Sequence, residues 1–194
     1  MIVTTQQLKE KYSEYSNPIS KINREIKNGN LFPLRKGLYE TESNVDGFKL
    51  AQFIYGPSYL SFDYALSEYG LIPEMVHNFT CATFNKNKSK TYKNKFGTFL
   101  YRDVPKDVFS LGVVVKNYKE YSYQIATPEK ALCDKLYTVP PVKTIDALYD
   151  LLFKDLRIYE DDFYKLNKED LFKLAPLYRS TNLNFLLKII KGER

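Results

Sequence analysis

The sequence has no tryptophan, and it holds only one histidine, His77, and two cysteines, Cys81 and Cys133, among 194 residues. One histidine cannot build a histidine-rich metal site, and two cysteines do not make the disulfide framework of a small secreted domain. Neither a glycine-rich P-loop nor a Gly-x-Ser-x-Gly elbow occurs. We therefore expect a binding protein and not an enzyme, with no metal and no cofactor.

Long apolar runs are also missing. No run approaches the ~20 residues of a membrane-spanning helix, and the first residues show neither the basic nor the apolar region of a secretory signal. The apolar fraction of 44% and the charged fraction of 27% are those of a globular protein. These features predict a cytoplasmic location and no membrane partner.

Basic residues outnumber acidic ones, 29 to 23, and they are unevenly distributed. Residues 1–40 hold seven basic and four acidic groups, whereas residues 84–106 hold seven and one. Clustered lysines bind nucleic-acid phosphates, although a solvated loop has the same composition. The second segment therefore predicts a contact with nucleic acid or a protein partner. Its candidate residues are Lys86, Lys88, Lys90, Lys93 and Lys95.

The N-terminal segment predicts two helices. Thr4 and Gln7 form a capping box that opens a helix over about 4–15. Asn17 and Pro18 open a second helix that ends near Gly29. An apolar stripe on this helix consists of Ile19, Ile22 and Ile26. Its polar side consists of Ser20, Lys21, Asn23, Arg24, Lys27 and Asn28.

Residues 31–39 predict two short strands around a basic turn that holds Arg35 and Lys36. Two helices followed by a basic hairpin are typical of a small winged helix-turn-helix, whose second helix enters the major groove. We therefore predict that operator DNA contacts the polar side of the second helix together with Arg35 and Lys36. A surface helix with an ordinary charged face is the alternative interpretation.

We place a domain boundary near residue 41, so that residues 1–41 form the winged-helix-like domain and 42–194 a second domain. Strand-forming stretches at 76–84, 97–101, 111–116 and 120–125 predict an antiparallel sheet over about 76–125. The lysine-rich stretch reads as a loop or hairpin tip, because Lys and Asn are poor strand formers. Thr127 and Pro128 then open a helical region over 127–194. The predicted fold class is α+β.

Two other clusters do not favour catalysis. Cys81 and His77 lie four apart on an expected strand, ~13 Å from each other by strand rise, so both cysteines are expected to be small buried hydrophobes. Glu160, Asp161 and Asp162 form the densest acidic run, which predicts a solvated turn and not a metal site.

Three segments resemble those of the AbiEi-like antitoxins of bacterial type IV toxin–antitoxin and abortive-infection systems. Residues 35–39 (Arg-Lys-Gly-Leu-Tyr) are similar to the end of the family's wing, Arg-x-Gly-hydrophobic-Tyr. Residues 59–73 resemble its segment of Tyr-hydrophobic-Ser, Ala-Leu, His-Gly-Leu and Pro, with Tyr69 at the position of the His. Residues 126–134 resemble its Glu-Lys-Ala-Leu-x-Asp helix. The resemblance covers about residues 1–137.

The resemblance implies an N-terminal winged helix that represses its own operon, and a second domain that neutralises a nucleotidyltransferase-like toxin encoded nearby, with or without a stable complex. Such systems act in phage defence. The chain departs from the family in two places: it has room for two helices before the wing where three are common, and Tyr64 stands where a serine is frequent. The alternatives are a protein-interaction module without a DNA role and an RNA-binding protein that uses the lysine-rich 84–106 loop.

Overall fold

The computed structural model contains both helices and strands and describes residues 1–118 and 121–192. The N-terminal unit has the order β1 (Ile2–Thr4), α1 (Thr5–Lys11), α2 (Pro18–Lys27), β2 (Phe32–Arg35) and β3 (Leu38–Glu40). Its strands form an antiparallel sheet in the order β1-β3-β2. The two expected helices and the hairpin are confirmed, whereas β1 was not predicted, because three residues carry too little pattern to identify a strand.

The expected caps account for both helices. The Thr4 hydroxyl accepts a hydrogen bond from the Gln7 backbone N–H, and the Gln7 side chain accepts one from the Thr4 backbone N–H. The Asn17 side chain accepts from the Ser20 N–H, and Pro18 takes the first helical position of α2. The first helix ends at Lys11 and is therefore shorter than the predicted 4–15.

The centre of the molecule is a six-stranded sheet in the order β6-β7-β5-β4-β9-β8. Its strands are β4 (Tyr59–Leu60), β5 (Phe79–Thr83), β6 (Lys90–Asn94), β7 (Gly97–Asp103), β8 (Val113–Tyr118) and β9 (Tyr121–Ala126). The short helices η1 (Gly47–Lys49) and α3 (Ala51–Ile54) precede β4, and α4 (Phe62–Glu68) and η2 (Lys106–Val108) connect strands of the sheet.

The prediction of an antiparallel sheet over 76–125 is wrong in two respects. The sheet is mixed, because β5 pairs in parallel with β7 and β4 pairs in parallel with β9. It also includes β4, which lies before residue 76. The pattern of strand-forming residues does not predict which strands are neighbours. Here β7 lies between β6 and β5, and because β6 is antiparallel to β7, β7 runs in the same direction as β5. Glu120, part of the last predicted strand, lies outside the described residues.

The expected helical region after Thr127 is confirmed as far as residue 192, and residues 193–194 lie outside the described part. Its elements are α5 (Pro128–Thr138), α6 (Ile145–Asp150), η3 (Leu151–Asp155), α7 (Glu160–Phe163), α8 (Lys168–Leu174), η4 (Ala175–Tyr178) and α9 (Thr181–Lys191). The solvated turn predicted at 160–162 is instead the first turn of α7, where acidic side chains favour the positive end of a helix.

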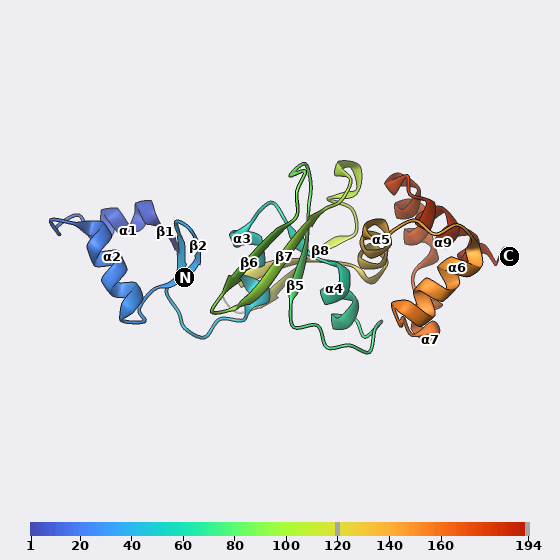
Figure 1. The fold of residues 1–194 in the computed structure, drawn as a ribbon, viewed down its shortest axis with the longest axis horizontal. Coiled ribbons are helices and arrows are strands. Elements are labelled where there is room, and N and C mark those ends of the chain that lie inside the picture. Colours follow the sequence, from blue (N-terminus) through green and yellow to red (C-terminus); the bar gives the residue numbers. More distant parts are fainter. Residues whose placement is uncertain (119–120, 193–194) are drawn as a thin grey trace.

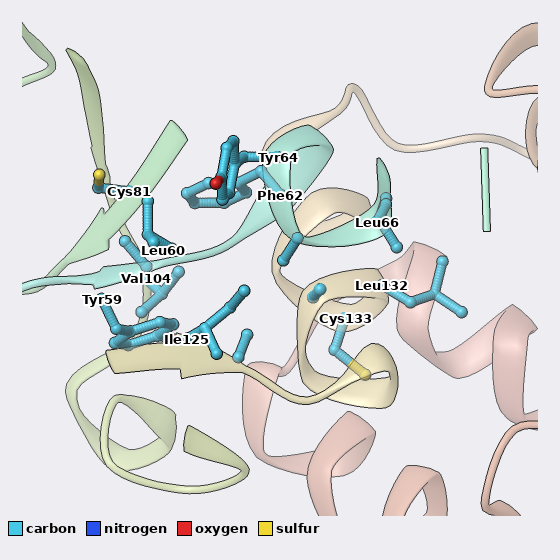
Figure 2. Close-up of a cluster of buried hydrophobic side chains, with 14 of the residues drawn as sticks. Tyr59, Leu60, Phe62, Tyr64, Leu66, Cys81, Val104, Ile125, Leu132 and Cys133 are labelled. Carbon is cyan, nitrogen blue, oxygen red and sulfur yellow. The ribbon is translucent and has the colours of Figure 1, made fainter. Parts of the chain in front are cut away.

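Figure 1 shows the N-terminal unit at one end of the molecule, the sheet in the middle and the C-terminal helices at the other end. The main core lies where β4, α4, β9 and α5 meet (Figure 2), with Leu60, Ile125 and Leu132 at most 1% exposed. A second, smaller cluster of Val3, Leu8, Ile22 and Leu31 holds the N-terminal unit together. Within residues 1–118 and 121–192, no helix has the length and apolar character to cross a membrane.

Candidate nucleic-acid interface

Helix α2 presents most of the predicted DNA-contacting side chains to solvent. Ile22 is 2% exposed and points into the small N-terminal core, which turns the opposite face of the helix outward. The exposed candidates on that face are Ser20, Asn23, Arg24, Lys27 and Asn28. In Figure 1, α2 lies at the outer end of the molecule, away from the six-stranded sheet. The helix therefore has an open polar face of the kind that a major groove accepts.

Lys21 is the exception among the candidates on α2. Its ammonium lies 2.6 Å from Glu25 Oε1 and 5.2 Å from the centre of the Tyr15 ring. The hydrogen bond to Glu25 raises the pKa of Lys21, and the same contact lowers the pKa of Glu25. Because its charge is already neutralised within the helix, Lys21 is a poorer phosphate ligand than Arg24 or Lys27. The spacing of four residues between Lys21 and Glu25 is the sequence signal for this pair.

The predicted basic turn connects β2 and β3. Arg35 and Lys36 are both exposed there, and Gly37 has a φ of +83°, which favours glycine. The Thr5 N–H at the start of α1 donates to the Gly37 carbonyl at 3.0 Å. The turn is therefore fixed to the first helix, and its two cations extend from a defined position.

The lysine-rich segment is not a loop throughout, which corrects the expectation for 84–106. Lys90–Asn94 form β6, an edge strand that pairs with β7. Side chains alternate along it, so that Lys90, Tyr92 and Asn94 are partly buried and Lys93 is exposed. Lysine and asparagine have low strand propensity, but pairing with β7 outweighs that preference here.

The end of β6 packs against the N-terminal unit and brings the two basic segments together. The Asn94 side-chain amide donates to the Leu34 carbonyl at 3.1 Å. The Lys95 ammonium lies 3.8 Å from the centre of the Phe32 ring, which lies 6.0 Å from that of Phe96. Lys95 is consequently next to β2, the strand that leads to Arg35.

At the start of the lysine-rich segment, backbone N–H groups that could bind an anion are already bonded to a carboxylate of the same chain. Asn85 and Asn87 have φ values of 53° and 54°, which turn neighbouring backbone N–H groups to one side. The Asp103 carboxylate accepts from the Lys86 and Asn87 N–H groups, both at 2.7 Å. Such concave N–H arrangements bind anions, and here the anion is Asp103.

The remaining features of this end also reduce its capacity to bind a single strand. The Lys86 ammonium donates to the Gly56 carbonyl at 3.2 Å. The Tyr92 ring packs 5.9 Å from both Tyr55 and Tyr101. Of the five lysine candidates, Lys88 and Lys93 are the two that are exposed and have neither a hydrogen bond nor a ring contact within the described residues.

Two of the three segments that carry the antitoxin resemblance meet in a buried network. The Asp134 carboxylate accepts from the Tyr59 hydroxyl at 2.9 Å and from the Ser61 hydroxyl at 2.7 Å. Lys130 and Asp134 lie 2.9 Å apart, and both side chains are 0% exposed. Burial lowers the pKa of Lys130, although Asp134 opposes that shift. The second and third family-like segments therefore stabilise each other inside the fold and do not form a surface site.

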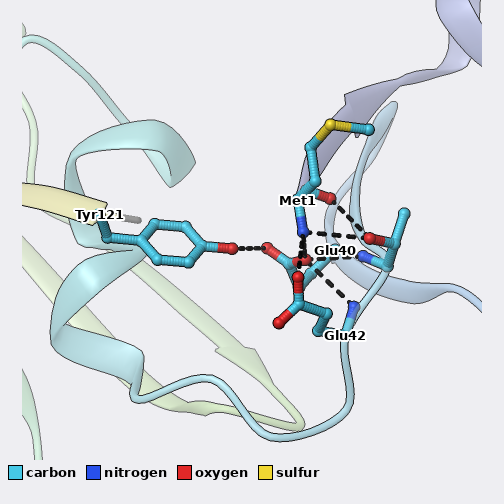
Figure 3. Close-up of polar contacts among 5 residues, drawn as sticks. Met1, Glu40, Glu42 and Tyr121 are labelled. Carbon is cyan, nitrogen blue, oxygen red and sulfur yellow. Dashed lines mark hydrogen bonds and ion pairs between the residues drawn. The ribbon is translucent and has the colours of Figure 1, made fainter. Parts of the chain in front are cut away.

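A buried glutamate joins the N-terminal unit to the central sheet (Figure 3). The Tyr121 hydroxyl of β9 donates to Glu40 Oε2 at 3.0 Å, and the Met1 amine and the Glu42 N–H contact Glu40 Oε1. Burial opposes ionisation of Glu40, but these donors together lower its pKa. Glu40 is therefore a charged, fixed connection between the two sheets.

The cysteines and the histidine form no catalytic group. Cys81 and Cys133 are buried, and burial raises the pKa of both thiols, which makes them poor nucleophiles. His77 is exposed and precedes β5. In the described part of the chain, no group of three or more His, Cys, Asp or Glu side chains could hold a metal ion.

The fold and the candidate interface define an α+β protein with an N-terminal strand–helix–helix–hairpin unit. Comparison of the chain with protein-family models finds no match, and comparison with curated proteins finds none either.

Proposed function

We propose that this protein is a DNA-binding autorepressor of its own operon and the antitoxin of a type IV toxin–antitoxin system. The observation that carries the DNA-binding half is the arrangement of residues 1–41. A strand, two helices and a hairpin follow one another, and the first strand pairs with the last. We interpret this order as a winged helix without its first helix, in which α2 is the recognition helix and the turn at Arg35 and Lys36 is the wing.

Charge and exposure support this assignment. Arg24 and Lys27 extend from the open face of α2, and Arg35 and Lys36 extend from the turn. None of these side chains forms an ion pair within residues 1–118 and 121–192. Cations without an internal partner can replace the counterions of a DNA backbone, and their release favours binding.

The antitoxin half rests on the resemblance of residues 35–39, 59–73 and 126–134 to the AbiEi-like family. A nucleotidyltransferase-like toxin encoded nearby is the expected partner. The buried contacts between Asp134 and Ser61 explain why two of these segments occur together. These contacts stabilise the fold and do not determine whether neutralisation proceeds by direct contact with the toxin or by action on a shared target.

A mobility-shift titration with the DNA upstream of the gene tests the DNA-binding half. We expect sequence-preferring binding that weakens with salt, and we expect Arg24→Ala and the double variant Arg35→Ala/Lys36→Ala to weaken it. Each lost phosphate contact should reduce the slope of log affinity against log salt by ~0.9. Lys143→Ala, which removes an exposed lysine near the C-terminal helices, is the control and should leave the slope unchanged. Binding without sequence preference or salt dependence would refute this half.

Co-expression with the neighbouring gene tests the antitoxin half separately. We expect the chain to restore growth when the neighbouring toxin is induced, and we expect Arg24→Ala/Lys27→Ala to restore growth while losing repression of a promoter fusion. Growth that stays arrested with the unaltered chain would contradict the antitoxin assignment and leave the DNA-binding result intact.

A further inference from the structure

Ile19 lies on the outside of α2, which corrects its expected place in the apolar stripe. Ile22 is 2% exposed, whereas Ile19 is 43% exposed. The reason is geometric: three residues advance a helix by about 300°, so that Ile19 lies at the border of the buried stripe and not at its centre. An exposed, stiff, apolar side chain therefore stands in the first turn of a helix whose outer face is otherwise polar.

Asn23 is the next side chain in the same row, four residues later. It is exposed, and in the part of the chain that the structure describes its side-chain amide has no hydrogen-bond partner. Of the other asparagines near α2, Asn17 caps the helix and the Asn30 amide donates to Glu25 at 2.7 Å, whereas Asn28 is the C-cap residue and lies outside the row of Ile19 and Asn23. Asn23 consequently has a free donor and a free acceptor beside an exposed apolar side chain.

This pair matches the pattern of an adenine and a thymine in a major groove. A side-chain amide can donate to adenine N7 and accept from the adenine N6 amino group, and an apolar side chain can pack on the thymine methyl group. Ile19 and Asn23 are separated by about 6 Å along the helix, and base pairs rise by about 3.4 Å. The two side chains would therefore reach base pairs one or two steps apart.

We propose that Asn23 and Ile19 determine the sequence specificity of the chain, with Asn23 reading an adenine and Ile19 a thymine methyl group one or two base pairs away. This inference rests on the proposed DNA-binding function and adds the base-reading residues to it. Lys27 is the next residue in the row. Its ammonium group has no acceptor atom and contributes a phosphate contact that does not discriminate between sequences.

Selection of bound duplexes from a randomised library tests the pair, with the unaltered chain, Asn23→Ala, Ile19→Ala and Lys27→Ala run in parallel. We expect the unaltered chain to select a site that contains the adenine and the thymine. Asn23→Ala should lose the preference at the adenine by about 5- to 150-fold, the range for one bidentate base contact. Lys27→Ala should weaken binding to all sequences alike.

Base analogues in the selected site separate a direct contact from a change in the protein. Replacing the thymine by uracil removes only the methyl group and should weaken binding of the unaltered chain about fourfold, but leave Ile19→Ala unaffected. Replacing adenine by 7-deazaadenine should weaken the unaltered chain and leave Asn23→Ala unaffected. All substituted side chains are exposed or half-exposed, and matched melting temperatures confirm folding.

The outcomes distinguish this inference from the function on which it rests. If the unaltered chain selects no sequence, the DNA-binding function and the inference fall together. If it selects a site but Asn23→Ala and Ile19→Ala keep the same preference at every base, the function stands and the assignment of these two residues is overturned.

Discussion

The buried network around Asp134 gives a stability prediction whose magnitude follows from its contacts. One carboxylate oxygen accepts from Lys130 at 2.9 Å and from Tyr178 at 2.6 Å, and the other accepts from Tyr59 at 2.9 Å and Ser61 at 2.7 Å. Both charged side chains are 0% exposed. Asp134→Ala therefore leaves an ammonium and three hydroxyl groups in the interior without their common acceptor.

Removing one partner of a buried ion pair costs about 3–5 kcal/mol, and an unsatisfied hydroxyl adds about 1–3 kcal/mol. We expect Asp134→Ala to lower the free energy of unfolding by at least ~4 kcal/mol, a large share of the ~5–15 kcal/mol of a typical domain. Lys130→Met should cost less, ~3 kcal/mol, because three hydroxyl donors still surround the carboxylate. The double variant should cost less than the two single changes added together, by about 1–3 kcal/mol.

Urea unfolding followed by far-ultraviolet circular dichroism measures these differences in a chain that lacks tryptophan. Asp150→Ala is a matched control, because Asp150 and Lys154 are also four residues apart and 2.7 Å from each other, but exposed. That change should cost under ~0.5 kcal/mol. If Asp134→Ala does not fold, Asp134→Asn, which keeps an acceptor oxygen, replaces it in the cycle. A loss below ~1 kcal/mol or strict additivity would show that the network is not coupled.

Three further predictions concern backbone strain, the link between the sheets and alkaline pH. Gly112→Ala should destabilise the fold by ~2 kcal/mol or more in urea unfolding, because φ is +64° and an added Cβ would lie 2.9 Å from Lys130 Cβ. Gly29→Ala is the control: φ is +73° but no atom lies within 4 Å of an added Cβ, so only the strain of the backbone conformation should lower its stability. Equal losses of stability in the two variants would contradict the steric argument. Tyr121→Phe should cost ~1–2 kcal/mol, because it removes a hydrogen bond to the buried, charged Glu40, and an unchanged urea midpoint would refute this. In an alkaline titration, the part of the tyrosinate absorbance that comes from three buried tyrosines should appear only together with unfolding. Burial raises the pKa of these tyrosines above 10, so the stability that they contribute below pH 10 is lost at higher pH. Ionisation of these three tyrosines while the chain stays folded would contradict this. These tyrosines are Tyr59, Tyr101 and Tyr178.

The elements that were predicted correctly from the sequence are those with strong local signals. Asn17 with Pro18 and Thr127 with Pro128 fix helix starts through one cap and one ring each, so their positions follow from adjacent residues. The strand β4 consists of two residues, Tyr59 and Leu60, and is held by its partners on both sides. Its existence depends on tertiary contacts that no local pattern contains.

The candidate interface could be predicted only in part, for a similar reason. The helical period assigned six residues to the exposed side. Five of them are exposed, whereas Lys21 is partly buried and paired with Glu25. The same reasoning did not reveal that Asp103 fills the backbone concavity at Lys86, because the two residues are brought together by the pairing of β5 with β7. Charge counts along a sequence cannot separate a cation that has an internal partner from one that is free.

The positions that carry the resemblance and the positions proposed to read DNA differ in their physical constraints. Lys130, Asp134 and Ser61 are 0% exposed and hydrogen-bonded to one another, so most substitutions there would destabilise the scaffold. Ile19 and Asn23 are exposed. The buried residue of α2 is Ile22, which lies on the opposite face and holds the helix in place, so Ile19 and Asn23 can both change without loss of the fold. A resemblance carried by the buried network therefore supports a shared scaffold and does not extend to a shared operator. On this reasoning, exchanging only the exposed residues of α2 should transfer sequence preference between chains of this fold while leaving the urea midpoint unchanged.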